Sequence, residues 1–153
     1  MNLQGNTLDS FSKTKKMKRV EVKSQIKSSS ETIIKAFLDS DMLKGWWSVE
    51  RCLIENKIGG IYILAWQIND TGFGYVNSGT IKSFDPNTEL VISNFVYMNP
   101  KKKILGPMSL TIRATEIDFA TSEIYICQDG YQNGIDWDWY YEAVKRAWPT
   151  EIK

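Results

Sequence analysis

The sequence predicts an α+β domain in which an antiparallel sheet packs against a C-terminal helix. From about residue 49 to residue 128, apolar and polar side chains alternate, and turn signals recur at the intervals of an antiparallel meander. After residue 130 the period changes to that of a helix, with one apolar stripe formed by Trp137, Tyr141, Val144, Trp148 and Ile152. We therefore expect one face of this helix to bind the sheet and the other to face solvent.

The elements before the meander are predicted to be a strand and a helix. Apolar and charged residues alternate over 20–26, as in a half-buried strand. Ser28 and Glu31 have the spacing of a capping box, in which the serine hydroxyl accepts from the backbone and the glutamate reaches back. This pattern predicts a helix that begins at Ser28 and carries Phe37 on its apolar face.

A second short helical turn is expected to be capped by Ser40 and Asp41 and to lead to the adjacent pair Trp46 and Trp47. Such a pair commonly has one ring buried and the other nearer solvent. This arrangement suits the mouth of a cavity or a contact with a partner. The alternative is that both rings form an apolar plug at the edge of the sheet.

Turn signals divide the meander into strands. Gly59 and Gly60 precede the first of them, and Asp85 and Pro86 place proline where a type I turn accepts it. The predicted strands are residues 61–68, 75–84, 90–97, 108–117 and 122–128. In the final helix, Pro149 is expected to remove a backbone hydrogen bond and to bend the helix, unless a new helix begins there.

Length and composition limit the function classes. The 153 residues are enough for one domain with a core, which we place at 19–153 after a flexible extension at 1–18. The net charge of +1 gives no general attraction to nucleic acid, and no segment has the length and apolarity of a membrane span. We therefore expect no nucleic-acid partner and no membrane insertion.

The absence of histidine is the strongest negative feature. It removes the commonest general base near neutral pH and the commonest zinc ligand. Cys52 and Cys127 have no metal-ligand spacing, and two distant cysteines do not make the disulfide framework of a small secreted domain. The sequence therefore predicts no metal or other cofactor, and it favours a cytoplasmic location.

Several landmarks occur together in a characteristic order. They are Ser28 to Glu31, Phe37, Trp46-Trp47, Gly59-Gly60-Ile61-Tyr62, Gly79-Thr80-Ile81, Asp85-Pro86, Asp129-Gly130 and Trp148. In this order and spacing the chain resembles the single-domain relatives of the Hsp90 ATPase activator family, within the START-like or Bet v 1-like group, over roughly residues 19–153. The resemblance implies the helix-grip fold, a curved antiparallel sheet wrapped around a long C-terminal helix, usually with an apolar cavity between them.

The resemblance also implies a set of ligand-binding side chains. Aligning the family pattern at its glycines and counting alternate strand positions gives the residues that face the helix. Together with Trp46 of the tryptophan pair and three residues of the helical stripe, they are Trp46, Tyr62, Leu64, Trp66, Ile81, Leu110, Ile112, Ile124, Ile126, Gln128, Trp137, Tyr141 and Trp148. Gln128 stands where relatives often carry histidine, and its amide can donate and accept hydrogen bonds. Each side chain taken singly is better explained as part of a close-packed core than as a ligand contact.

Three functions follow as hypotheses. The first is a module that encloses a small apolar or amphipathic molecule. The second is a co-chaperone that docks on Hsp90 and stimulates its ATPase, as the family name implies. The third is an enzyme of the cyclase or hydratase kind, for which Tyr62, Tyr141, a carboxylate or a water held by Gln128 are the available bases. A homodimer is a further alternative for the partner.

Overall fold

A computed structural model describes residues 18–152, so the predicted extension at 1–18 lies outside the described residues except for Lys18. The elements are β1 (Arg19–Ile26), α2 (Ser30–Ala36), α3 (Ser40–Trp47), β2 (Arg51–Ile54), β3 (Ile61–Trp66), β4 (Tyr75–Asp85), β5 (Glu89–Met98), β6 (Leu105–Glu116), β7 (Ser122–Asp129) and α4 (Ile135–Glu151). None of the described helices is long and apolar enough to cross a membrane.

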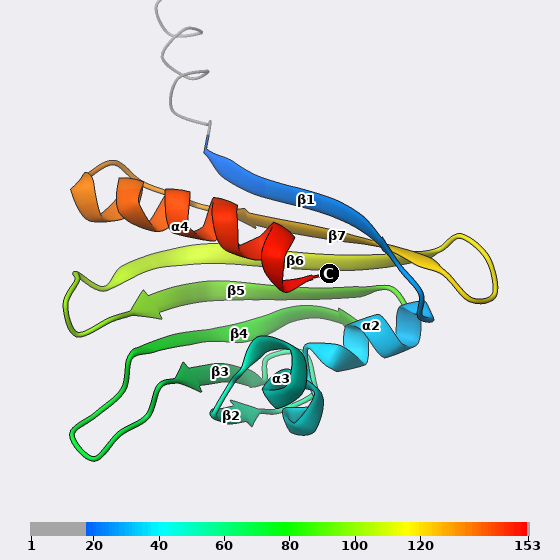
Figure 1. Cartoon of the computed structure of the whole chain (residues 1–153), viewed down its shortest axis with the longest axis horizontal. Coiled ribbons are helices and arrows are strands. Elements are labelled where there is room, and N and C mark those ends of the chain that lie inside the picture. Colours follow the sequence, from blue (N-terminus) through cyan, green and yellow to red (C-terminus); the bar gives the residue numbers. More distant parts are fainter. Residues whose placement is uncertain (1–17, 153) are drawn as a thin grey trace, which may run out of the picture.

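The strands form a seven-stranded sheet with the order β1-β7-β6-β5-β4-β3-β2. All neighbouring strands are antiparallel. The segment α2–α3 carries the chain from β1 at one edge to β2 at the other, and α4 runs along the same side of the curved sheet (Figure 1). The predicted fold class, a helix-grip arrangement with two short helices after the first strand, is therefore confirmed.

Both short helices are capped one residue away from the predicted position. Ser29, rather than Ser28, is the N-cap of α2, and its Oγ accepts from the backbone N–H of Thr32 at 3.1 Å. Asp39 is the N-cap of α3, and its Oδ2 accepts from the N–H of Met42 at 3.1 Å. The predicted capping box at Ser28 is therefore wrong by one residue, because consecutive serines can cap a helix equally well.

The inward side chains of the strands follow the predicted alternation. In β3, Tyr62, Leu64 and Trp66 are buried, and in β7 the buried set includes Ile124, Ile126 and Gln128. Ile81, Leu110 and Ile112 are also buried. These side chains form one core with the apolar faces of α2, α3 and α4, which fixes the strand register because a slip of one residue would expose them.

The apolar stripe of α4 differs from the prediction at its N-terminal half. The buried side chains of α4 are Tyr140, Val144 and Trp148, spaced four residues apart, whereas Trp137 and Tyr141 are only partly buried. Either adjacent tyrosine fits a helical period, so periodicity could not choose between them. The prediction of Tyr141 is corrected to Tyr140 because the hydroxyl of Tyr140 meets the buried amide of Gln128.

Pro149 does not interrupt α4, which continues to Glu151. The proline lies in the last turn, so few helical bonds follow it. Because proline has no backbone N–H, the carbonyl of Lys145 lacks its usual helical hydrogen bond, but the helix does not end there. The predicted bend or restart at Pro149 is therefore not needed to place Trp148 against the sheet.

Candidate functional site

A pocket of about 520 Å³ lies between α4 and strands β3, β4 and β5. The end of α3 and the residues after it, from Trp47 to Glu50, form one side of it. Val144 and Trp148 of α4 form the opposite side. Because the exposed side chain of Glu50 borders the pocket, the pocket opens to solvent. Its size falls within the range of small-molecule sites in proteins.

Aromatic side chains encircle this pocket. Eight line it, and we call six of these the aromatic wall: Trp47, Trp66, Tyr75, Tyr97, Tyr140 and Trp148. In that order, consecutive ring centroids lie 5.2, 4.7, 6.0 and 4.4 Å apart as far as Tyr140. The rings of Trp148 and Trp47 are 5.0 Å apart. Such contacts hold large rigid rings in fixed positions.

Gln128 closes the remaining gap in the aromatic wall. Its side chain is 2% exposed, and its Nε2 donates to the Tyr140 hydroxyl at 2.9 Å. Its Oε1 accepts from the indole N–H of Trp148 at 3.2 Å, and Nε2 also contacts the sulfur of Met108 at 3.8 Å. Both polar atoms of the amide are therefore hydrogen-bonded, and the side chain fixes the orientation of the rings of Tyr140 and Trp148.

Asn77 is the polar side chain in the pocket that lacks a partner. It lies on β4, is 7% exposed, and its Oδ1 accepts no hydrogen bond from the described residues. A buried amide oxygen without a donor costs free energy, on the order of 1–3 kcal/mol. A ligand with a donor group would satisfy it. Asn77 is not among the site residues predicted from the sequence. The signal was available, because Asn77 lies four positions before the predicted Ile81 and therefore on the same face of the strand.

The hydroxyls of the pocket are neutral at physiological pH. Burial raises the pKa of Tyr140, and the hydrogen bond from Gln128 offsets only part of this effect. Burial also raises the pKa of Tyr97, whose hydroxyl accepts from the Asn99 amide at 3.0 Å. These groups can orient a ligand by hydrogen bonding, but they are poor general bases.

The structure separates the predicted site residues into groups. Trp66, Gln128 and Trp148 border the pocket. The side chains that instead fill the core beneath it are Tyr62, Leu64, Ile81, Leu110, Ile112 and Ile126. Their role in ligand binding stays a prediction. The residues of the pocket that sequence reasoning missed include Trp47, Tyr75, Tyr97 and Tyr140.

The other predicted residues lie at two different places. Trp46 and Ile124 border a smaller apolar pocket of about 240 Å³ between α2, α3 and the end of α4. Trp137 and Tyr141 pack around Tyr131, with ring centroids 6.3 and 5.1 Å away. The paired indoles of α3 stack at 5.0 Å, so one tryptophan faces each pocket.

The groups considered for acid–base chemistry are not assembled in the pocket. The hydroxyl of Tyr62 is buried and donates to the backbone oxygen of Phe37 at 2.7 Å. The carboxylates that border the pocket are Glu50 and Glu151. Within residues 18–152, no group of three or more acidic or cysteine side chains could hold a metal ion.

Comparison with known proteins identifies the family of this chain. The model of the family described as activator of Hsp90 ATPase homolog 1-like protein matches residues 27–151. The chain belongs to this family. No curated protein matches the sequence.

Several solved structures share the fold at low sequence identity. An Hsp90 activator from Plasmodium falciparum is 13% identical, with a TM-score of 0.64 and coverage of 88% of this chain and 89% of that one. The Aha1 dimer from Colwellia psychrerythraea is 14% identical, with a TM-score of 0.64 and coverage of 89% and 91%. A protein from Rhizobium loti is 13% identical, with a TM-score of 0.69 and coverage of 88% and 94%. At these identities the likeness shows the fold alone.

Proposed function

We propose that this protein binds a small, largely apolar or amphipathic molecule in the pocket enclosed by the aromatic wall. The observation that carries the proposal is the combination of about 520 Å³ of space with six fixed aromatic side chains and one unpartnered buried amide, Asn77. Pockets for small ligands are typically apolar with a few oriented polar groups. A packed core would instead fill the space and pair the amide.

Native mass spectrometry of gently purified protein is the first test. We expect a retained species of small-molecule mass, which would also give the chemical class of the ligand. As a second readout, N-phenylnaphthylamine, a neutral apolar probe that fluoresces when it leaves water, should bind the purified protein. Its binding should be competed by any molecule recovered from the native complex.

A variant that fills the pocket makes the test specific. Ala143 lies on α4 and borders the pocket, so Ala143→Trp should abolish probe binding. The matched control is Ala120→Trp, which places the same ring at the exposed turn between β6 and β7. If Ala143→Trp bound the probe as well as the control while remaining folded, the pocket would not be the binding site.

Stimulation of the Hsp90 ATPase is the second candidate function, and family membership is the observation that favours it. A structural neighbour is described as an Hsp90 activator. A coupled ATPase assay with purified Hsp90 tests it directly. An increased turnover with the parent protein and with Ala143→Trp would indicate an activity independent of the pocket, whereas no increase with either would remove this candidate.

We also propose that the protein forms a homodimer and that it is located in the cytoplasm. One structural neighbour is described as a dimer, and size-exclusion chromatography with light scattering would detect a dimer here. Cys52 and Cys127 form no disulfide, which supports a reducing compartment such as the cytoplasm. Imaging of a tagged protein would test the location.

A further inference from the structure

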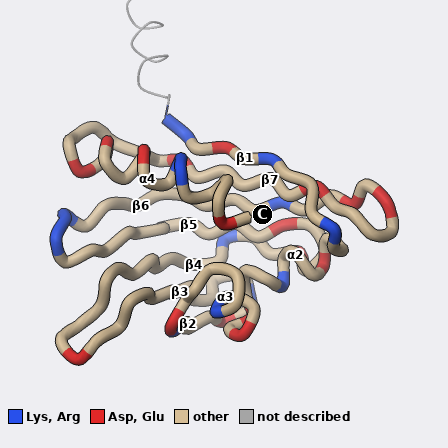
Figure 2. The backbone as a smooth tube through the Cα atoms, viewed as in Figure 1, with Lys and Arg blue, Asp and Glu red and all other residues tan. Residues whose placement is uncertain are grey.

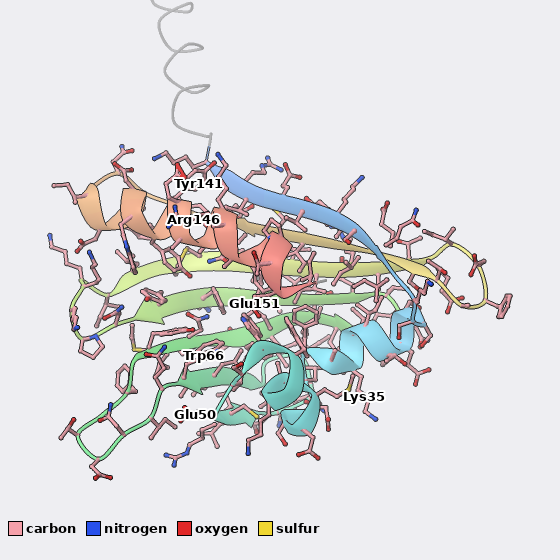
Figure 3. The ribbon with its side chains drawn as sticks, viewed as in Figure 1. Lys35, Glu50, Trp66, Tyr141, Arg146 and Glu151 are labelled. Atoms are coloured by element: carbon pink, nitrogen blue, oxygen red, sulfur yellow. The ribbon has the colours of Figure 1, made fainter. Side chains whose placement is uncertain are left out.

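The charged side chains at the mouth of the pocket are all negative. Glu50 and Glu151 both border it, and no lysine or arginine does so among the described residues. The two carboxylates lie on either side of Trp66 (Figure 3). Neither carboxylate forms an ion pair within residues 18–152. Basic residues lie in the turn between β5 and β6 and on α4 (Figure 2), but none of them lines the pocket.

Both carboxylates are placed to act on a ligand. Glu50 Oε2 accepts from the backbone N–H of Ile68 at 2.9 Å, which fixes this side chain at the rim. Across the pocket, the pKa of Tyr75 is raised, mainly by burial and to a smaller extent by the neighbouring Tyr97. The negative charge of Glu151 raises it further. Glu151 is therefore within electrostatic reach of the aromatic wall.

The aromatic wall itself favours positive charge, because the face of an aromatic ring carries negative electrostatic potential. The protein already uses one ring of the pocket in this way. Lys102 Nζ lies 4.6 Å from the ring centroid of Trp139, which borders the pocket at its partly exposed end. The charge of Lys102 is balanced by Asp136 at 3.8 Å, so it does not compensate the two rim carboxylates.

Asn77 gives an independent indication. Its Oδ1 is buried, lines the same pocket and accepts no hydrogen bond from the described residues. An amide oxygen presents negative partial charge, as do the ring faces and the carboxylates. Three different kinds of group therefore direct negative potential into one space.

We infer that the ligand is an amphipathic ammonium ion, whose positive group lies against the aromatic wall near Glu151 and Glu50 and whose apolar part contacts Val144 and Phe95. This inference rests on the proposed function. A cation is attracted by the faces of aromatic rings, and the carboxylates add to this attraction. An anionic ligand of the same shape would be repelled.

Three probes that share one carbon skeleton test the charge. They are phenylbutylammonium, the neutral alcohol phenylbutanol and the anion phenylbutanoate, titrated at neutral pH and followed by tryptophan fluorescence and calorimetry. We expect the ammonium ion to bind about tenfold more tightly than the alcohol, and the anion more weakly than both. All binding should be lost in Ala143→Trp.

Carboxylate variants assign the effect to the rim. Combined Glu50→Gln and Glu151→Gln substitution should weaken ammonium binding roughly threefold to tenfold and leave alcohol binding unchanged. Glu142→Gln is the matched control, because Glu142 is an exposed carboxylate of the same helix outside the pocket. Glutamine retains an oxygen that can accept from Ile68, so the loop should stay in place.

The outcomes separate the two proposals. If the alcohol or the anion bound at least as tightly as the ammonium ion, and Ala143→Trp removed that binding, the charge inference would be overturned and the pocket would remain a binding site. If none of the three probes bound in a manner that Ala143→Trp removed, the proposed function and the inference would both be overturned.

Discussion

Gln128 Nε2 donates a hydrogen bond to the hydroxyl of Tyr140 at 2.9 Å, and this contact joins β7 to α4 inside the core. The same amide accepts from Trp148 at 3.2 Å. One side chain thus satisfies two buried polar groups that lie about two turns apart on the helix. Both aromatic partners border the pocket, so the amide couples the stability of the domain to the shape of the candidate site.

Gln128→Met should therefore lower the free energy of unfolding by about 2–4 kcal/mol. Methionine has a similar length, but it leaves the hydroxyl of Tyr140 and the indole N–H of Trp148 buried without partners. Urea denaturation measures the change. Gln25→Met on the exposed face of β1 is the matched control and should change stability by less than about 0.5 kcal/mol. Equal effects of both substitutions would contradict the structural role of Gln128.

Trp148→Ala should destabilise the domain by about 3–5 kcal/mol, because a buried indole is replaced by a cavity. The ring of Trp148 is 4% exposed and contacts Phe37 and Trp47, with centroids 6.4 and 5.0 Å away. Thermal and chemical denaturation measure the loss. A change below about 1 kcal/mol would mean that α4 does not depend on this ring for its packing.

Most of the fold could be predicted because its signals are local and repeated. Alternation over several residues identifies a strand, and most of the turns carry a proline or a glycine, so an error in one element does not spread to the next. The cap of α2 was harder to predict, because Ser28, Ser29 and Ser30 are chemically equivalent. Which of them becomes the N-cap is decided by the residue at which β1 ends. That point depends on pairing with β7, which is distant in the sequence.

The site was predicted only in part, and β5 shows the physical reason. Leu90 and Ile92 face the core at even positions, but Phe95 and Tyr97 face it at odd positions. The pairing of β5 shifts between Ile92 and Phe95, where Asn94 has a φ of 53°. A β-bulge of this kind reverses the face of every later residue in the strand. Counting from one anchor therefore could not bring Tyr97 to the pocket.

Glu89 should make the stability of the domain depend on pH. Its carboxylate accepts from Arg113 at 3.0 Å and from Ser83 at 2.9 Å, and these bonds, Arg113 foremost, lower the pKa of Glu89 from its ordinary value of 4.5. Because the folded-state pKa is the lower one, the stabilisation is fully present above the ordinary value. It is lost as the pH falls through the folded-state pKa.

Glu89→Gln should accordingly cost up to about 1 kcal/mol at neutral pH, a small effect because the Arg113 side chain is largely exposed. The difference from the parent should shrink below pH 4.5. Urea denaturation at neutral and acid pH measures it, with Glu123→Gln on β7 as a control. A constant difference across this range would show that the charge of Glu89 does not contribute.

Ile126→Trp and Ala143→Trp should have opposite consequences, although sequence reasoning places Ile126 at the ligand. Ile126 is fully buried within the sheet core and does not border the pocket, so the larger ring would overpack the core and destabilise the domain by about 1–3 kcal/mol or more. Ala143 faces the open space, where an added ring finds room. Ala143→Trp should therefore leave the free energy of unfolding nearly unchanged while it removes probe binding. If Ala143→Trp were the more destabilising of the two, the space beside α4 would be filled by the protein's own side chains in solution, and the pocket would not be available to a ligand.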